Sequence, residues 1–297
     1  MIEKIITINN ELCKQDGLCA QICPMKIFIQ ETKKTPHIEK TNHCVLCGQC
    51  LAVCPASAIH HSRLRKEDLV QIVEPHPVNE KAMMTLIRQR RSVRVYKNKE
   101  IPADVLEEIA DSCGYCPTGA HGQQGWVRNI TIVSGQENMK RILDLTVEYM
   151  RMLKSKLEGF VVNYLSRWIP EIQGGLATLP DISLRLAQYE KGRDVILYNA
   201  PAAIFVHAPR NTSTPQIDCD AALYSMMLLA HTKGLGTCWM GWVQNAAAGF
   251  QVKSFTALRD FLKIPTDHRV YGALIIGYPK IQLHSIPPRE TRINWIN

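Results

Sequence analysis

The sequence predicts two domains that each combine helices with strands, and three observations support this. Seven of the eleven cysteines fall between Cys13 and Cys54. A polar stretch follows that contains Pro75 and Pro77. Beyond it, residues 81–297 carry helix-like and strand-like apolar segments and no further cysteine cluster. We therefore expect a cysteine-rich domain at 1–62, a linker at 63–80 and a second domain at 81–297.

Composition narrows the class of protein. The chain has 297 residues, 46% of them hydrophobic, and a formal net charge of +8. This is enough for a sizeable core. The chain has neither a run of 18 apolar residues nor a secretory pattern at its start, so we expect a cytoplasmic protein without a membrane segment. The basic residues accompany no recognition motif, and we therefore expect no nucleic-acid partner.

An internal repeat organises the cysteines. The segment Cys13–Pro24 reads CKQDGLCAQICP, and Cys44–Pro55, 31 residues later, reads CVLCGQCLAVCP. The second copy has the C-x2-C-x2-C-x3-C-P spacing of bacterial two-cluster ferredoxins. Three thiolates at i, i+3 and i+6 on a curled loop can face one iron–sulfide cubane. Zinc would prefer two separated CxxC pairs around a tetrahedral ion, so the spacing favours iron–sulfur clusters.

Residues 1–62 therefore resemble the bacterial-type ferredoxin domain over nearly its whole length. The resemblance implies two clusters whose ligands cross between the repeats: Cys44, Cys47, Cys50 and Cys23 for a [4Fe-4S] cluster, and Cys13, Cys19 and Cys54 for the other, with Asp16 at its fourth corner. Two interpretations of Asp16 remain open. Its carboxylate binds the fourth iron as a harder, weaker ligand, or that iron is absent and a [3Fe-4S] cluster remains. Both predict two clusters of unequal chemistry.

Four motifs follow one another in the second half. RRSVR spans Arg90–Arg94 at the end of an apolar helix, and PTGAHGQQGW begins at Pro117. GLGTCWMG spans Gly234–Gly241 at the end of a second apolar helix, and a GYP strand is followed by a tail that contains Arg289. This ordered set resembles the FMN-dependent nitroreductase family. The resemblance covers residues 81–297 and implies an α+β fold and an obligate homodimer with FMN at the subunit interface.

The resemblance also assigns residues to the flavin. Arg90, Ser92 and Arg94 should contact its phosphate and ribityl chain, with Arg91 alongside and Arg289 reaching the phosphate from the tail. The remaining contacts are Pro117, Thr118 and Gly119 from the partner subunit, and Met240 and Gly241 against the ring. The loop is one residue longer than the common form, so either Gln123 or Gln124 meets the flavin edge.

Two segments outside these motifs, and His121 within the PTG loop, have two interpretations each. Helical residues 146–194, interrupted by prolines and glycines, would form either a lid over the flavin or plain packing. His121 would be a flavin contact or an exposed loop residue. Cys113 and Cys116 form a CxxC without the strand-then-helix setting of thioredoxins, which favours buried thiols over a redox pair.

The combination predicts an FMN- and iron–sulfur-dependent oxidoreductase without a catalytic side-chain acid or base. Clusters carry single electrons, whereas a flavin accepts electrons singly and delivers two as hydride. We expect a low-potential donor, ferredoxin or NAD(P)H, to supply electrons through the clusters. The acceptor would be a small nitro, quinone or activated-alkene compound. The alternative is a redox sensor or electron-shuttling subunit that passes electrons from the clusters via the flavin to a partner protein.

Overall fold

The computed structural model describes residues 5–75, 77–119, 128–165, 168 and 170–296. The chain divides into two compact units, and the first ends at Pro77 where the second begins at Val78. This change of unit falls inside the expected linker, which contains the 3-10 turn η2 (Lys66–Asp68). None of the helices in the described part of the chain is long and apolar enough to cross a membrane.

The first unit contains two short sheets and two short helices. β1 (Ile6–Ile8) pairs antiparallel with β4 (Ile59–His61), and β2 (Phe28–Ile29) pairs with β3 (His37–Ile38). The helices α1 (Leu18–Ile22) and α2 (Gln49–Val53) contact each other, and η1 (Thr41–His43) precedes the second cysteine motif. Apolar side chains from both sheets surround the buried cysteines in one small core.

The two cysteine motifs share a backbone conformation as well as a spacing. Gly17 and Gly48 precede α1 and α2, and both have φ of 71°. The residues two positions earlier, Gln15 and Leu46, also have positive φ, at 58° and 56°. Positive φ is uncommon outside glycine, so its recurrence at equal offsets shows that the two cluster loops follow the same path.

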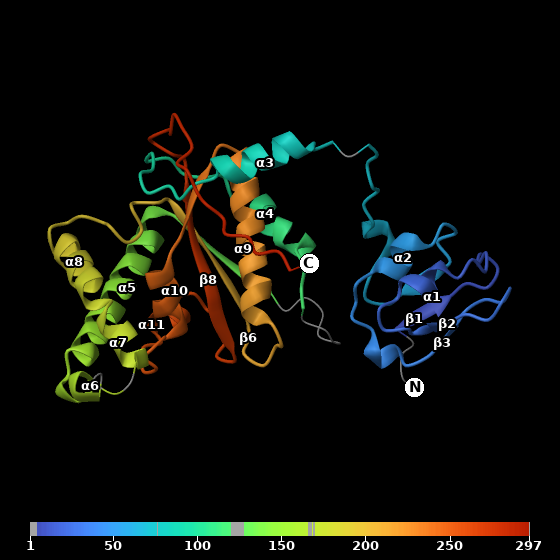
Figure 1. Ribbon diagram of the computed structural model, residues 1–297, viewed down its shortest axis with the longest axis horizontal. Helices are drawn as coiled ribbons and strands as arrows, with labels where there is room; N and C mark the ends of the chain where they lie inside the picture. The colour runs from blue at the N-terminus through green and yellow to red at the C-terminus, as the bar shows by residue number, and fades with distance from the viewer. Residues whose placement is uncertain (1–4, 76, 120–127, 166–167, 169, 297) are drawn as a thin grey trace. The chain divides into compact units, whose positions relative to one another are not determined.

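The second unit is built on a four-stranded antiparallel sheet in the order β5-β6-β8-β7 (Figure 1). Its strands are β5 (Asn129–Ser134), β6 (Ala202–Pro209), β7 (Gly236–Trp239) and β8 (His268–Gly277). Along β6, Ala203 and Phe205 belong to one core, whereas Ala202 and Ile204 belong to another. The sheet is therefore buried on both faces, which explains why β6 reads as a continuous apolar run.

Helices cover each face. α4 (Ala103–Asp111), the 3-10 turn η3 (Ser112–Tyr115) and α9 (Pro215–Thr232) lie on one side, and α5 (Gln136–Leu157), α8 (Leu179–Glu190), α10 (Gly241–Ala248) and α11 (Ala257–Phe261) lie on the other (Figure 1). α3 (Glu80–Gln89) precedes the RRSVR segment, and α6 (Phe160–Leu165) and α7 (Pro170–Leu176) connect α5 to α8. This mixture of helices with an antiparallel sheet confirms the predicted α+β class.

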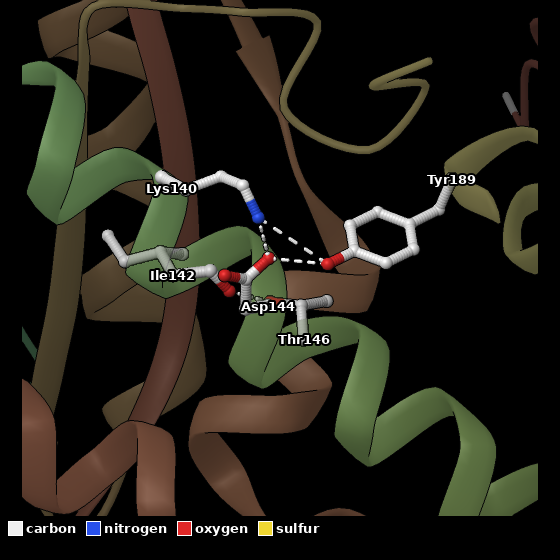
Figure 2. A network of polar contacts seen from close by, with 5 residues as sticks. All are labelled: Lys140, Ile142, Asp144, Thr146 and Tyr189. Atoms are coloured by element: carbon white, nitrogen blue, oxygen red, sulfur yellow. Dashed lines mark hydrogen bonds and ion pairs between the residues drawn. The ribbon is translucent and has the colours of Figure 1, made fainter. Parts of the chain in front are cut away.

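A polar cluster joins α5 to α8. Asp144 on α5 accepts a hydrogen bond from the Tyr189 hydroxyl of α8 at 2.6 Å. It also forms an ion pair with Lys140 (Figure 2). Burial opposes the ionised form of Asp144, but the bonds from Lys140 and Tyr189 outweigh it and hold the pKa of the carboxyl below its ordinary value. The described part of the 146–194 segment contains the helices α6, α7 and α8, as expected, and the polar contacts of Asp144 fix α8 to α5.

Candidate cluster and cofactor sites

The predicted cluster ligands form two groups. Burial raises the pKa of the Cys19 thiol, and the charges of Cys13 and Cys54 raise it further. These three cysteines therefore lie together, although Cys54 belongs to the other repeat. Thiolates crowded in this way repel one another, and binding to a metal cluster removes that repulsion because the metal holds each thiol deprotonated.

The second group draws on both repeats in the same way. Burial raises the pKa of Cys50 to about 12, and the charges of Cys47, Cys44 and Cys23 add to the shift. Cys23 comes from the first repeat and the other three come from the second. The two groups have the crossed composition that the ferredoxin resemblance implies, and the donor set suits two thiolate-held clusters.

The described residues contain no group of three or more His, Cys, Asp or Glu side chains that could hold a single metal ion. Such a site needs donors that converge on one point. In an iron–sulfur cluster each thiolate binds its own iron, so the ligand sulfurs stand around the cluster without sharing a centre. The absence of such a group among the described residues therefore concerns sites for a single metal ion and not iron–sulfur clusters.

Asp16 occupies the loop position that Cys47 has in the second repeat. Both residues are exposed, and each lies between a positive-φ residue and a positive-φ glycine. One carboxylate oxygen of Asp16, Oδ1, accepts the backbone N–H of Leu18 at 3.1 Å. A carboxylate offers about four lone-pair sites on two oxygens, so this local bond is compatible with an iron ligand as well.

The RRSVR segment lies beside β7. The Val93 N–H donates to the Thr237 carbonyl oxygen at 2.9 Å, and Ser92 forms a parallel bridge with the same residue. The Nε atoms of Arg90 and Arg91 are buried, and neither has a hydrogen-bond partner in the part of the chain that the structure describes. A buried donor without an acceptor costs about 1–3 kcal/mol, so this cationic pair suits an anionic group such as a phosphate.

The C-terminal tail contacts one of these arginines, Arg91. Arg91 Nη2 donates to the Pro287 carbonyl oxygen at 3.0 Å. Lys280 N–H donates to the Val95 carbonyl oxygen at 3.0 Å and fixes the start of the tail. Arg289, two residues beyond Pro287, is exposed. Arg289, which we predict to contact the phosphate, therefore lies two residues from the backbone carbonyl that binds Arg91.

Met240 and Gly241 follow β7, and they differ in whether their backbone N–H groups are already used within the chain. The Met240 N–H already donates to the Ala273 carbonyl oxygen at 2.8 Å. Gly241 is the first residue of α10, and the first N–H groups of a helix have no intrahelical acceptor. Of the two residues predicted to face the flavin ring, Gly241 therefore carries the N–H that a ligand can use.

Two buried side chains that the sequence analysis missed hold the PTG loop. Asp218 is 1% exposed, and it accepts the Thr118 hydroxyl at 2.9 Å and the Gly119 N–H at 2.8 Å. Arg128 is 8% exposed and donates to the Pro117 carbonyl oxygen at 3.1 Å. The first three residues of the loop are thus held by two buried charges. Gln123, Gln124 and His121 lie outside the described residues.

The RRSVR arginines and the PTG loop, both predicted to contact flavin, lie at opposite ends of α9. Asp218 is in the first turn of α9 and His231 is in the last. Burial, followed by the charge of Arg90, lowers the pKa of His231, which places Arg90 at the far end. At 1.5 Å per residue, the two positions are roughly 20 Å apart along the helix axis. Within one chain, the arginines and the PTG loop therefore do not share a site.

Of the remaining cysteines, Cys116, Cys219 and Cys238 are buried and Cys113 is half-buried. Cys116 Sγ contacts Ser225 Oγ at 3.0 Å, and burial raises the pKa of Cys113 and of Cys219. Cys238 in β7 is 3% exposed. These positions match the expectation of packing residues.

Comparisons with known proteins found relatives of both domains. A Bacteroides fragilis nitroreductase solved with bound FMN superimposes with a TM-score of 0.52 at 21% identity, covering 74% of this chain and 100% of that one. A 4-nitrobenzoate reductase from a Nocardioides species is 24% identical over 226 residues, which are 71% of this chain and 85% of that protein. A protein named Ferredoxin 7Fe from Hydrogenibacillus schlegelii is 37% identical over 54 residues, 18% of this chain and 67% of that protein.

The fold and these residues define an oxidoreductase with an N-terminal iron–sulfur domain. Residues 5–55 match the 4Fe-4S dicluster domain, and residues 87–278 match the nitroreductase family. The chain belongs to the nitroreductase family. Both predicted folds, the two-cluster ferredoxin-like one and the nitroreductase-like one, are thereby confirmed.

Proposed function

We propose that this protein is an FMN-dependent oxidoreductase that takes electrons through two iron–sulfur clusters and reduces a small acceptor. The observation that carries the proposal is the pair of buried Nε donors of Arg90 and Arg91 beside β7. Two buried guanidinium Nε–H donors without acceptors among the described residues suit a phosphate dianion, because arginine presents a fixed fork of donors. Ser92 and Arg94 would extend this grip along the ribityl chain, and Arg289 would close it from the tail.

The chain's own groups would position the flavin and exclude water. The Gly241 N–H at the start of α10 would donate to the ring, and Met240, which is 5% exposed, would pack against it. When bound, FMN supplies both single-electron exchange and two-electron hydride transfer. No side-chain acid or base is required from the protein for this chemistry.

We propose a homodimer in which Pro117, Thr118 and Gly119 of the partner subunit complete each flavin site. The separation of the arginines from the PTG loop along α9 supports this proposal, because one chain supplies only half of the expected contacts. Asp218 and Arg128 would hold the loop in shape for the partner's flavin.

The N-terminal unit would hold the two clusters through the crossed cysteine groups, with Asp16 at the exposed corner of one. We propose ferredoxin or NAD(P)H as the electron donor and a nitro, quinone or activated-alkene compound as the acceptor. The names of the Nocardioides and Bacteroides relatives support the nitro compound. Thiols in this number are typical of a reducing compartment, which supports a cytoplasmic location.

The test is anaerobic purification followed by measurement of iron, acid-labile sulfide, FMN and molecular mass in solution. We expect two clusters and one FMN per chain in a dimer. Reductive titration with NADH, NADPH and reduced ferredoxin, each in turn, then identifies the donor. Protein that carries both clusters and binds no FMN would refute the proposal.

A further inference from the structure

We propose that His61 raises the reduction potential of the cluster held by Cys44, because its Nε2–H donates a hydrogen bond to the Cys44 sulfur. The inference rests on the cluster ligation proposed above. It concerns a histidine at the end of β4 that is not a ligand and that is 3% exposed.

The geometry fixes which ring nitrogen carries the proton. His61 Nδ1 lies 3.1 Å from the backbone nitrogen of Arg63, whose N–H can only donate. Nδ1 is therefore the acceptor and carries no hydrogen, which places the proton of the ring on Nε2. Nε2 lies 3.6 Å from Cys44 Sγ. The ring thus presents a donor to the sulfur, and the Arg63 backbone holds it in that tautomer.

A donor at a ligand sulfur favours the reduced cluster. Reduction adds negative charge that spreads onto the sulfurs, and hydrogen bonds to those sulfurs are among the features that set the potential. The Leu46 N–H already reaches Cys44 Sγ at 3.4 Å, and the Ala58 N–H reaches Cys54 Sγ of the other group at 3.3 Å. His61 adds a side-chain donor to the Cys44 sulfur, and its burial strengthens the effect.

The first repeat has a glutamine, Gln30, at the sequence position equivalent to His61. Gln30 lies 31 residues before His61, which is the offset that relates the two motifs. Its Nε2 donates to the Glu31 and Lys34 carbonyl oxygens at 2.8 and 2.7 Å. Its Oε1 is buried with no hydrogen-bond partner among the described residues. A Cβ on Gly17 would meet Gln30 Cγ at 3.3 Å, so this side chain lies against the loop that carries Asp16.

The two clusters would therefore differ at a second pair of positions besides Asp16 and Cys47. The Cys44 sulfur receives a side-chain donor, whereas the repeat-related amide uses its donors on backbone carbonyls. We infer that His61 increases the fraction of the electrons entering the domain that reside on the Cys44 cluster.

The experiment is a redox titration of full-length, anaerobically purified protein, followed by EPR of each cluster after iron and sulfide have been measured. His61→Phe keeps a planar ring and removes the donor. We expect the reduction equilibrium constant of one cluster to fall about tenfold, which is about 59 mV for a one-electron couple. The other cluster should be unchanged. His61→Gln retains an N–H at similar reach and should restore most of the loss.

Gln30→Leu is the matched control, because it alters the equivalent position and should leave the potential of the Cys44 cluster where it is. Unchanged potentials in His61→Phe protein with full iron content would overturn the inference. Wild-type protein with FMN but without clusters would instead overturn the proposed ligation.

A second measurement is made on the wild-type protein, with one variant as its control. Wild-type protein labelled with ring-15N histidine should show a 15N hyperfine coupling to the reduced cluster, and this coupling should be absent from labelled His61→Gln protein. If labelled wild-type protein shows no such coupling, His61 does not donate to the cluster and the inference is wrong.

Discussion

The Thr118 hydroxyl donates a hydrogen bond to the carboxylate of Asp218, far away in the sequence, at 2.9 Å. The same carboxylate accepts the Gly119 N–H through its other oxygen at 2.8 Å. A single buried charge on α9 therefore holds Thr118 and Gly119, two of the residues that we assign to the partner's flavin.

Replacing Asp218 should weaken flavin binding. Asp218→Asn leaves one acceptor oxygen and introduces an amide that cannot accept, so one of the two loop donors loses its partner. A lost buried bond of this kind costs about 1–3 kcal/mol. We expect FMN affinity, measured by the change in flavin fluorescence, to fall by about tenfold. Asp220→Asn is the control, because Asp220 bonds Gln216 instead of the loop. Equal affinities in the two variants would contradict the positioning role.

The arginine pair can be tested with a change that keeps the charge. Arg90→Lys retains a cation but loses the guanidinium fork that grips a phosphate. A bond to a charged group contributes about 1.5–3 kcal/mol, so we expect the FMN dissociation constant to rise about tenfold or more. Arg88→Lys, in the last turn of α3 just before Arg90, should bind FMN like the wild type. If Arg90→Lys binds FMN as tightly as the control, Arg90 does not hold the phosphate.

The Asp16 corner predicts a change in cluster chemistry. Asp16→Cys places a thiolate where the second repeat has Cys47, and thiolates bind this iron more strongly than carboxylates do. We expect iron content to rise or hold, and the EPR signals of the two clusters to become more alike. Lys14→Cys, two residues earlier in the same loop, should leave iron content and spectra unchanged. Identical spectra for wild-type and Asp16→Cys protein would remove Asp16 from the ligand set.

The α5–α8 cluster predicts a pH-dependent contribution to stability. Because its folded-state pKa is depressed below the ordinary 3.8, Asp144 stabilises the fold above that value and loses this contribution as the pH falls through the folded pKa. Asp144→Asn should lower the free energy of unfolding by about 1 kcal/mol at neutral pH, a value discounted for partial exposure. The difference from wild type should shrink below about pH 4.

Urea unfolding followed by circular dichroism of the helices measures this difference. Glu148→Gln removes the same charge from an exposed position of α5 and serves as the control. A pH-independent difference for Asp144→Asn would show that lost packing, and not the ion pair, destabilises that variant.

Residues that carry chemistry in their type and spacing were predictable, and residues that act through distant contacts were not. The cysteine repeat and RRSVR are local patterns. Asp218 and Arg128 each lie in a segment that looks ordinary, and their role depends on a loop that only folding brings to them. His61 follows the same logic, because only strand pairing places it near Cys44.

Element boundaries show a similar limit. The apolar helix before GLGTCWMG begins at Pro215, ahead of its apolar pattern, because proline is well suited to the first turn and the polar residues that follow conceal that pattern. The apolar strand that leads into GYP begins at His268, where two partly buried polar residues extend it.

The length of α9 has a consequence for how the protein would behave on dilution. If the arginines at one end serve one subunit and the loop at the other end serves its partner, flavin retention is coupled to subunit association by mass action. The protein would then lose its flavin as its concentration falls below the dimer dissociation constant, and added FMN would draw the subunits back together.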